Sequence, residues 1–388
     1  MVCHENNSFK DKIKIAAVTR KILQYSLLWP KDDTELNPGI EYKLKVFGFF
    51  LITGTMSLLN TIHFVLVIKN KEDLDIEEVA VIIATYGTYY MVCAYINNQH
   101  NLALLLHDLS DFKKFGKPPG FDKKNKQLNF YSKLIVLYSL LAVGFYAYMR
   151  YLDRDTCRAT HAAKKTNGNF CGLITPLWIP VKTDYFPVFQ LLFIYVFIAV
   201  HMLVKMGMPI SFSALEIAHH IILRINHLKD MIIECLKNKN DEQRSANLKI
   251  CILYHNEILN LTARLDKTFY HCMFGHFALT GAICAVLEKQ IVDGYNVYAG
   301  VVHFAGWILA LLLGCVGGQH LLDASEVIPG AIWSSNWYMM PAKVQKDVLF
   351  MLVNSQNKFF IRTGPFGMLC LPLFVSVLKA SYSILCMF

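Results

Sequence analysis

The chain has 388 residues, of which 54% are hydrophobic and only 17% are charged. Soluble proteins carry about 25% charged residues, so this composition argues against two or three soluble domains and favours a protein embedded in lipid. A transmembrane helix needs about 20 predominantly apolar residues. Seven stretches meet that requirement, at 46–68, 79–97, 134–151, 185–204, 269–287, 297–316 and 366–388. The sequence therefore predicts an all-α integral membrane protein with seven transmembrane helices.

The N-terminal segment 1–45 holds no apolar run long enough for a cleaved signal peptide. We therefore expect this segment to remain in the cytosol. Within it, residues 13–28 combine apolar and basic positions in a helical pattern. Such a pattern suits an amphipathic helix that lies at the membrane surface, and a helix packed on the membrane bundle is the alternative.

Lysine and arginine beside short loops mark the cytoplasmic side of a membrane protein. The connection 101–133 holds seven lysines, whereas the connection 69–78 holds two lysines among five acids. We therefore place 101–133 in the cytosol and, with an odd number of spans, the C-terminus outside. The external loop 152–184 is also basic, and longer loops obey the rule less closely.

Two helical segments continue beyond the predicted spans. Apolar residues recur every three or four positions over 209–266, and 343–360 is amphipathic up to the Thr363-Gly364-Pro365 break. Such stripes need partner subunits to bury them, so we expect a cytosolic anchor domain. The predicted regions are a cytosolic segment at 1–45, helices one to four at 46–208, anchor at 209–266, helices five and six at 267–317, anchor with the first half of helix seven at 318–365, and the second half at 366–388.

Most of the eleven cysteines fall within the spans, where a thiol behaves as a small apolar side chain. Cys157 and Cys171 are the one pair in a single external loop, so a disulfide between them is one arrangement and two free thiols are the other. No Cys/His spacing matches a zinc site, and no histidine has a partner in a nucleophile pattern. We therefore expect no metal, no cofactor, no enzymatic activity and no nucleic-acid partner.

Seven helices also suggest a G-protein-coupled receptor, which remains an alternative. Asp153-Arg154-Asp155 has the look of that family's cytoplasmic ionic motif, but here the third span ends outside. The sixth span lacks a proline beside Trp307, and the seventh has no Asn-Pro pair. We therefore interpret Arg154 as a charged residue at the membrane interface.

The C-terminal third of the chain resembles that of insect odorant receptors. The resemblance is carried by Gly318-Gln319, Ser325, Ala331, Trp333, Asn336-Trp337-Tyr338, Pro341, Leu349, Ser355-Gln356, Gly364 and the ending VLKASYSILCMF. The related gustatory receptors end in a Thr-Tyr pair followed by apolar residues and Gln-Phe. This chain lacks that ending, so the odorant branch is favoured and a gustatory-type receptor channel is an alternative. The shared co-receptor of the family is longer, so this shorter chain looks like a tuned, ligand-specific subunit.

The resemblance implies a tetramer, usually of tuned and co-receptor subunits, whose seventh helices line one pore for cations in the plasma membrane of olfactory neurons. Stepping back from Leu385 in helical register gives Ser381, Leu378 and Phe374 on one face, with Phe388 one turn outward. An apolar ring bounded by a hydroxyl suits a gate that closes by dewetting. The alternative is that this stripe packs on neighbouring helices.

The outer halves of the predicted spans are rich in aromatic residues. We name as candidate ligand-binding residues Tyr86, Tyr89, Tyr90, Gly144, Tyr148, Phe189, Phe193, Tyr298 and His303. Such a cage selects a small, volatile, apolar odorant with one acceptor, for example an ester or a terpenoid, and the resemblance places the family's odorant pocket in this region. Aromatic residues at this depth are also ordinary core or lipid-interface residues.

Overall fold

A computed structural model describes residues 13–26, 28–29, 39–72, 76–164, 166, 168–183, 185–238, 240–294 and 296–387. Within these ranges the chain is helical, and the one pairing of extended backbone is an isolated bridge between Arg362 and Met368. The α-helices are α1 Ala17–Tyr25, α2 Ile40–Asn70, α3 Ile76–Asn97, α4 Gln99–Ser110, α5 Phe121–Leu152, α6 Arg154–Lys164, α7 Val188–Lys237, α8 Asp241–Val292, α9 Val297–Asp323, α10 Val327–Trp333, α11 Ala342–Ser355 and α12 Leu371–Leu385.

Six helices in the described part of the chain are long and apolar enough to cross a membrane: α2, α3, α5, α7, α8 and the helix that begins with α9. The seventh, α12, is apolar but has only 15 residues, about 22 Å at 1.5 Å per residue. The prediction of an all-α, seven-helix membrane protein is confirmed. The predicted start of the seventh span at residue 366 is wrong, because Gly367 has a φ of 106° and the helix begins only at Leu371.

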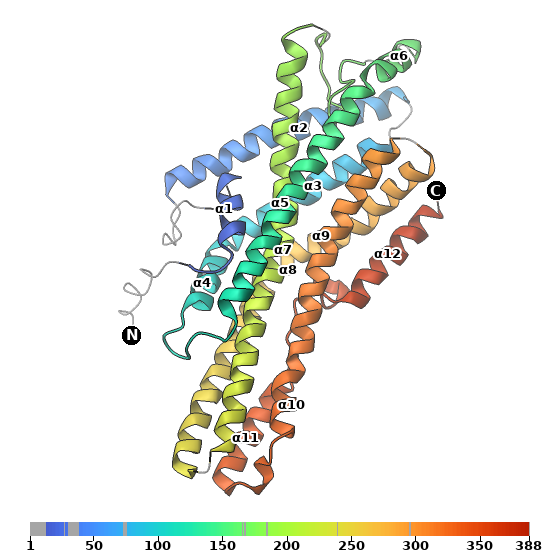
Figure 1. Cartoon of the computed structure of the whole chain (residues 1–388). Helices are drawn as coiled ribbons and strands as arrows, with labels where there is room; N and C mark the ends of the chain where they lie inside the picture. Colours follow the sequence, from blue (N-terminus) through green and yellow to red (C-terminus); the bar gives the residue numbers. More distant parts are fainter. Residues whose placement is uncertain are drawn as a thin grey trace.

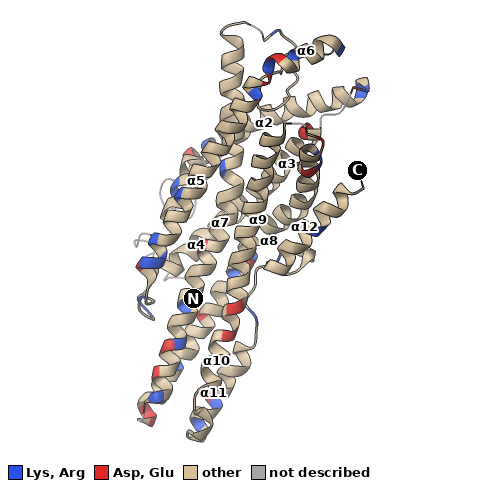
Figure 2. Cartoon of the chain, turned by 45° about the vertical axis from the view of Figure 1, so that its right-hand side comes forward, with Lys and Arg blue, Asp and Glu red and all other residues tan. Residues whose placement is uncertain are grey.

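The two longest helices, α7 and α8, have 50 and 52 residues, and α7 runs from one end of the molecule to the other (Figure 1). Fifty residues span about 75 Å, more than twice the roughly 30 Å hydrocarbon core. Figure 2 shows Lys, Arg, Asp and Glu around α6 at one end, on the lower part of α5, and along the half of the molecule that carries α10 and α11. We call the end with the α7–α8 connection, α10 and α11 the inner end, and the end with α6 the outer end.

Two adjacent glycines let α9 pack closely against its neighbours. A Cβ added at Gly317 would lie 2.7 Å from the Cα of Leu215 in α7. A Cβ added at Gly318 would lie 2.1 Å from the carbonyl oxygen of Leu369, in the segment that leads into α12. Both distances are shorter than any real contact of a methyl group. The Gly-Gly pair therefore fixes how α7, α9 and the start of α12 meet.

The N-terminal helix α1 packs on the bundle against α5 and α7. Its Thr19 hydroxyl donates to the Oε2 atom of Glu216 in α7 at 2.8 Å and lies 2.5 Å from the hydroxyl of Ser132 in α5. Ile15 and Leu23 are buried beside this contact. Of the two arrangements that suit the N-terminal amphipathic pattern, the structure shows the packed one.

Glu216 is a fully buried carboxyl group in the part of α7 that continues beyond the predicted span. Burial raises its pKa to about 7, although the Thr19 hydrogen bond and the charge of Arg20 oppose this rise. One turn later, burial lowers the pKa of His220 to about 3, and the charges of Arg224 and Lys124 act in the same direction. The fold therefore favours the neutral forms of both groups.

Exchange of Glu216 for glutamine should make the protein less sensitive to rising pH. The pKa of Glu216 is about 7 in the fold against the ordinary 4.5, so the wild type loses stability as pH rises from 4.5 to 7, by on the order of 3 kcal/mol. Glu216→Gln has no carboxyl to ionise. Its melting temperature in detergent, relative to that of the wild type, should therefore increase as pH rises across this window. The exposed Glu234→Gln on the same helix is the control, and an equal pH trend in wild type and Glu216→Gln would contradict the assignment.

Candidate ligand cavity and pore helix

A cavity of about 180 Å³ lies inside the membrane bundle, between α2, α3, α5, α7, α8 and α9. Its walls are mainly aliphatic, and Gly207 of α7 and Gly306 of α9 leave room in it. Ile174 and Thr175, from the external segment 168–183, also line it. A mostly apolar hollow between bundle helices is a common place for a small-molecule site.

A few polar side chains interrupt the apolar wall. The Trp307 indole N–H donates to the Nε2 atom of His303 at 3.1 Å, so Nε2 is the unprotonated nitrogen of that ring. The Tyr138 hydroxyl donates to the carbonyl of Val302 at 3.1 Å. Among the described residues, the buried hydroxyls of Tyr146 and Thr175 have no hydrogen-bond partner. The cavity can therefore offer hydroxyl donors to a single acceptor on an otherwise apolar molecule.

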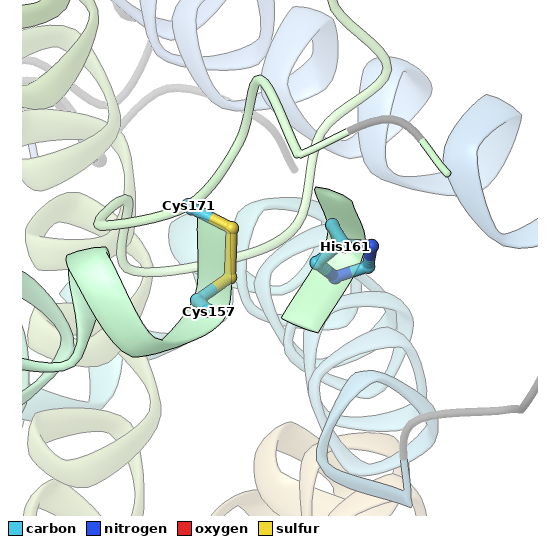
Figure 3. Close-up of side chains that lie close together, drawn as sticks. All are labelled: Cys157, His161 and Cys171. Atoms are coloured by element: carbon cyan, nitrogen blue, oxygen red, sulfur yellow. A yellow bond between two sulfur atoms is a disulfide. The ribbon is translucent and has the colours of Figure 1, made fainter. Parts of the chain in front are cut away.

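The segment 168–183 covers the outer side of the cavity and is anchored at several points. Asn60 of α2 donates from its Nδ2 atom to the carbonyl of Pro176 at 2.7 Å, and the Trp178 backbone N–H donates to the carbonyl of Leu59 at 3.0 Å. A disulfide joins Cys157 of α6 to Cys171 of the segment (Figure 3). These contacts hold Ile174 and Thr175 in the cavity wall.

His161 lies beside this disulfide on α6 (Figure 3). A ring nitrogen of His161 and the Cys157 and Cys171 sulfurs are close enough together to suggest a metal site. Both sulfurs are bonded to each other, however, so the group offers no thiolate ligand. The Nδ1 atom instead makes a 2.6 Å hydrogen bond with the Thr166 hydroxyl. We interpret the trio as a structural crosslink.

The structure divides the nine predicted ligand residues into three groups. His303 lines the cavity, whereas Gly144, Tyr148, Phe189 and Phe193 line a separate hollow between α5 and α7. The remaining four, Tyr86, Tyr89, Tyr90 and Tyr298, line neither of these two hollows.

Three of these four tyrosines make contacts between helices. The Tyr89 and Tyr86 hydroxyls bond those of Ser57 and Thr61 in α2, each at 2.8 Å. The Tyr90 hydroxyl lies 3.4 Å from the Nδ1 atom of His271.

Sequence reasoning did not name the cavity residues Tyr138, Tyr146 and His276 as ligand-binding residues. The spacing on α5 could have indicated two of them, because Tyr138, Ala142 and Tyr146 recur every four residues and so share one helix face.

The α12 helix packs on α8 and α9 with the face that was predicted to line a pore. Of that face, Ser381 is buried and Phe374, Leu378 and Leu385 are partly buried, while Phe388 lies outside the described residues. The free face carries Val375, Ser376, Lys379, Tyr382, Ser383, Cys386 and Met387. A single chain does not test which face lines a pore, so the register stays a prediction.

One polar contact fixes α12 to α8 within the membrane. The Ser381 hydroxyl donates to the Oε1 atom of Glu288 at 3.2 Å. The helices leave room beside it, since a Cβ added at Gly281 of α8 would lie at an ordinary 3.8 Å from a methyl group of Val377. Ionisable residues within a membrane are costly and often functional, so this contact is a candidate link between the bundle and α12.

Comparison with known proteins supports the resemblance seen in the C-terminal third. A family model described as 7tm Odorant receptor matches residues 73–382. Odorant receptor 24a of Drosophila melanogaster is 28% identical over 133 residues, which are 34% of this chain and 33% of the relative. The Odorant receptor coreceptor of the same species is 26% identical over 149 residues, covering 37% of this chain and 31% of the relative. The matches thus span about a third of the length of these relatives.

The fold matches a solved structure over nearly its whole length. The insect olfactory receptor OR5 from Machilis hrabei superposes with a TM-score of 0.76 at 15% identity, covering 95% of this chain and 96% of that one. The same receptor in complex with eugenol gives a TM-score of 0.75 at 14% identity. Since the family model spans most of the sequence and an insect olfactory receptor shares the fold from end to end, the chain belongs to the 7tm odorant receptor family.

Proposed function

We propose that this chain is a tuned subunit of an odorant-gated, non-selective cation channel in the plasma membrane of olfactory sensory neurons. Its ligand is a small, volatile, apolar molecule such as an ester or a terpenoid, and its site is the cavity lined by Tyr146, His303 and Trp307. The observation that carries the proposal is structural continuity. The cavity walls α8 and α9 are the same helices against which α12 packs.

Binding in this cavity depends mainly on apolar burial, at about 25 cal/mol per Å² removed from water. The unpartnered Tyr146 and Thr175 hydroxyls add orientation, because a ligand carbonyl or ether can accept from one of them. A buried donor that gains a partner recovers part of its desolvation cost. The cavity therefore favours apolar molecules that carry one acceptor.

The α8 helix connects the cavity to the pore helix. His276 lines the cavity, α12 packs on α8, and Glu288 of α8 accepts from Ser381 of α12. The positions from 276 to 288 span about 18 Å along one straight helix. A ligand that displaces the cavity end of α8 therefore also displaces the surface that holds α12.

Currents through this channel should require co-expression with the odorant co-receptor. Large apolar residues are exposed at the inner end, where Trp333 is 64%, Met339 75% and Phe350 59% exposed. A heterotetramer would bury such a surface. We expect an ester and terpenoid panel to evoke currents in cells with both chains and little current with this chain alone.

The same recording separates a channel from a G-protein-coupled receptor. Odorant currents that persist when the recording pipette blocks G-protein activation with a GDP analogue support the channel, whereas their loss supports G-protein coupling. Large currents from this chain alone would contradict the co-receptor requirement and leave the channel proposal standing. Absence of any ligand-evoked current with the co-receptor present would contradict the proposal itself.

A further inference from the structure

A second hollow, of about 460 Å³, lies on the outer half of the bundle between α5 and α7. It shares both helices with the ligand cavity but none of its lining residues. Its lining residue Ile194 is 53% exposed, and the neighbouring Leu141 and Leu191 are 64% and 62% exposed. Exposed aliphatic residues on membrane helices face lipid, so this hollow opens toward the bilayer. We call it the side groove.

Aromatic rings form the walls of the side groove. The centroids of Phe189 and Phe193 lie 6.1 Å apart, and the ring of Tyr151 lies 6.2 Å from each of them. Tyr148 also lines the groove. Above the groove, the guanidinium of Arg154 lies 3.7 Å over the Phe189 ring. The rings therefore enclose a space at the outer edge of the membrane.

The floor of the side groove is made of small residues. It contains Gly144 and the buried Ala147, and a Cβ added at Gly144 would meet nothing within 4 Å. The amide of Gln190 is the polar group that accompanies the tyrosine hydroxyls in the lining. The empty space over Gly144 is the room that a compact ligand would occupy.

The wall between the side groove and the cavity is thin. On α5, Ala147 lines the groove and Val143, four residues earlier, lines the cavity. On α7, Phe197 lines the groove and Val200, three residues later, lines the cavity. Three or four residues are about one helical turn, or about 5 Å. A molecule in the groove is therefore one turn away from the cavity along both helices.

We infer that the side groove is an antechamber, which binds small cyclic apolar molecules dissolved in the bilayer and passes them between α5 and α7 into the cavity. The ring walls favour a compact molecule, because aromatic faces and edges pack best on other rings. A linear acyl chain gains little from them and leaves Gln190 and the tyrosine hydroxyls without a partner. Binding in the side groove is independent of the proposed function, and only the claim that the molecule then acts as a ligand in the cavity rests on it.

Photolabelling tests binding in the side groove without any current. The full chain with its co-receptor, in lipid nanodiscs, is mixed with a diazirine derivative of menthol and irradiated. We expect label on Tyr148 and Tyr151 that excess menthol displaces. Gly144→Leu fills the groove and should abolish this label, whereas Gly54→Leu, on α2 and equally free of neighbours within 4 Å, should retain it. Label at these tyrosines from a diazirine phospholipid but not from the menthol probe would overturn the inference.

Irradiation at increasing delays after mixing tests the entry route. In the wild type, label should reach Tyr148 before it reaches Tyr146 in the cavity. Gly144→Leu should slow the labelling of Tyr146 severalfold while its final level stays unchanged, because the groove is a path and the cavity is intact. Labelling of Tyr146 at the wild-type rate in Gly144→Leu would show another entrance and overturn the antechamber. Since a chain that passes no current can still be labelled, this result is independent of the channel proposal.

Discussion

Replacement of Gly207 by leucine should remove most of the odorant response while the protein still reaches the cell surface. Gly207 lines the cavity, and a Cβ added there meets nothing within 4 Å. The new side chain therefore enters the space of about 180 Å³ that the ligand needs. Leucine is also a better helix former than glycine, so the helix itself is not weakened. We expect the half-maximal odorant concentration to rise about 100-fold, equal to about 2.8 kcal/mol of lost binding.

Two further variants make this result specific. Gly306→Leu fills the cavity from α9, where an added Cβ would lie at an ordinary 3.7 Å from the Tyr138 hydroxyl, and should give the same loss. Gly48→Leu on α2 is the matched control, because a Cβ there also meets nothing within 4 Å and the residue does not line the cavity. The dose response is measured at matched surface expression. Normal responses in both cavity variants would show that the ligand binds elsewhere.

The helical architecture was predictable because a bilayer imposes length and composition on each span. The structure contains a disulfide between Cys157 and Cys171. This pairing could also be proposed from the sequence, since one external loop holds both cysteines. Helix ends were less certain. The start of α12 depends on local backbone geometry at Gly367, and a hydropathy pattern carries no information about that geometry.

The cavity could not be derived from the sequence because its walls depend on how six helices cross. Tyr86 and Tyr146 are both tyrosines in predicted spans. The structure bonds the Tyr86 hydroxyl to Thr61 of α2 and leaves the Tyr146 hydroxyl, in the cavity wall, without a partner. Helical periodicity identifies which residues share a face, but the neighbour of that face follows from tertiary packing. His303 and the side-groove residues were therefore grouped together in sequence although they line different hollows.

The orientation of α12 also depends on tertiary packing that the sequence pattern does not contain. The apolar stripe that contains Leu378 and Leu385 was predicted to line the pore, and in the structure it packs against α8 and α9 of its own chain. In a tetramer built around α12, the face toward the axis is one that its own subunit leaves uncovered. Val375 is 46% and Tyr382 64% exposed on the free face. The free face, with Lys379 between Ser376 and Ser383, is therefore a second candidate for the pore surface beside the predicted apolar stripe.

Exchange of Lys379 for glutamate distinguishes the two registers. If the free face lines the pore, a positive charge in the ion path becomes negative, and Coulomb attraction between that carboxylate and divalent ions should raise calcium permeability severalfold. The reversal potential in high external calcium, at matched surface expression, should then become more positive. Lys346→Glu, an exposed change of the same charge on α11, should leave it unchanged.

In the register predicted from sequence, Lys379→Glu would leave the reversal potential unchanged, and Leu385→Ser would instead raise ligand-independent current by hydrating an apolar gate. Co-receptor subunits that share the ring would reduce either effect without changing its sign, so the variant that alters permeation identifies the face of α12 that ions meet.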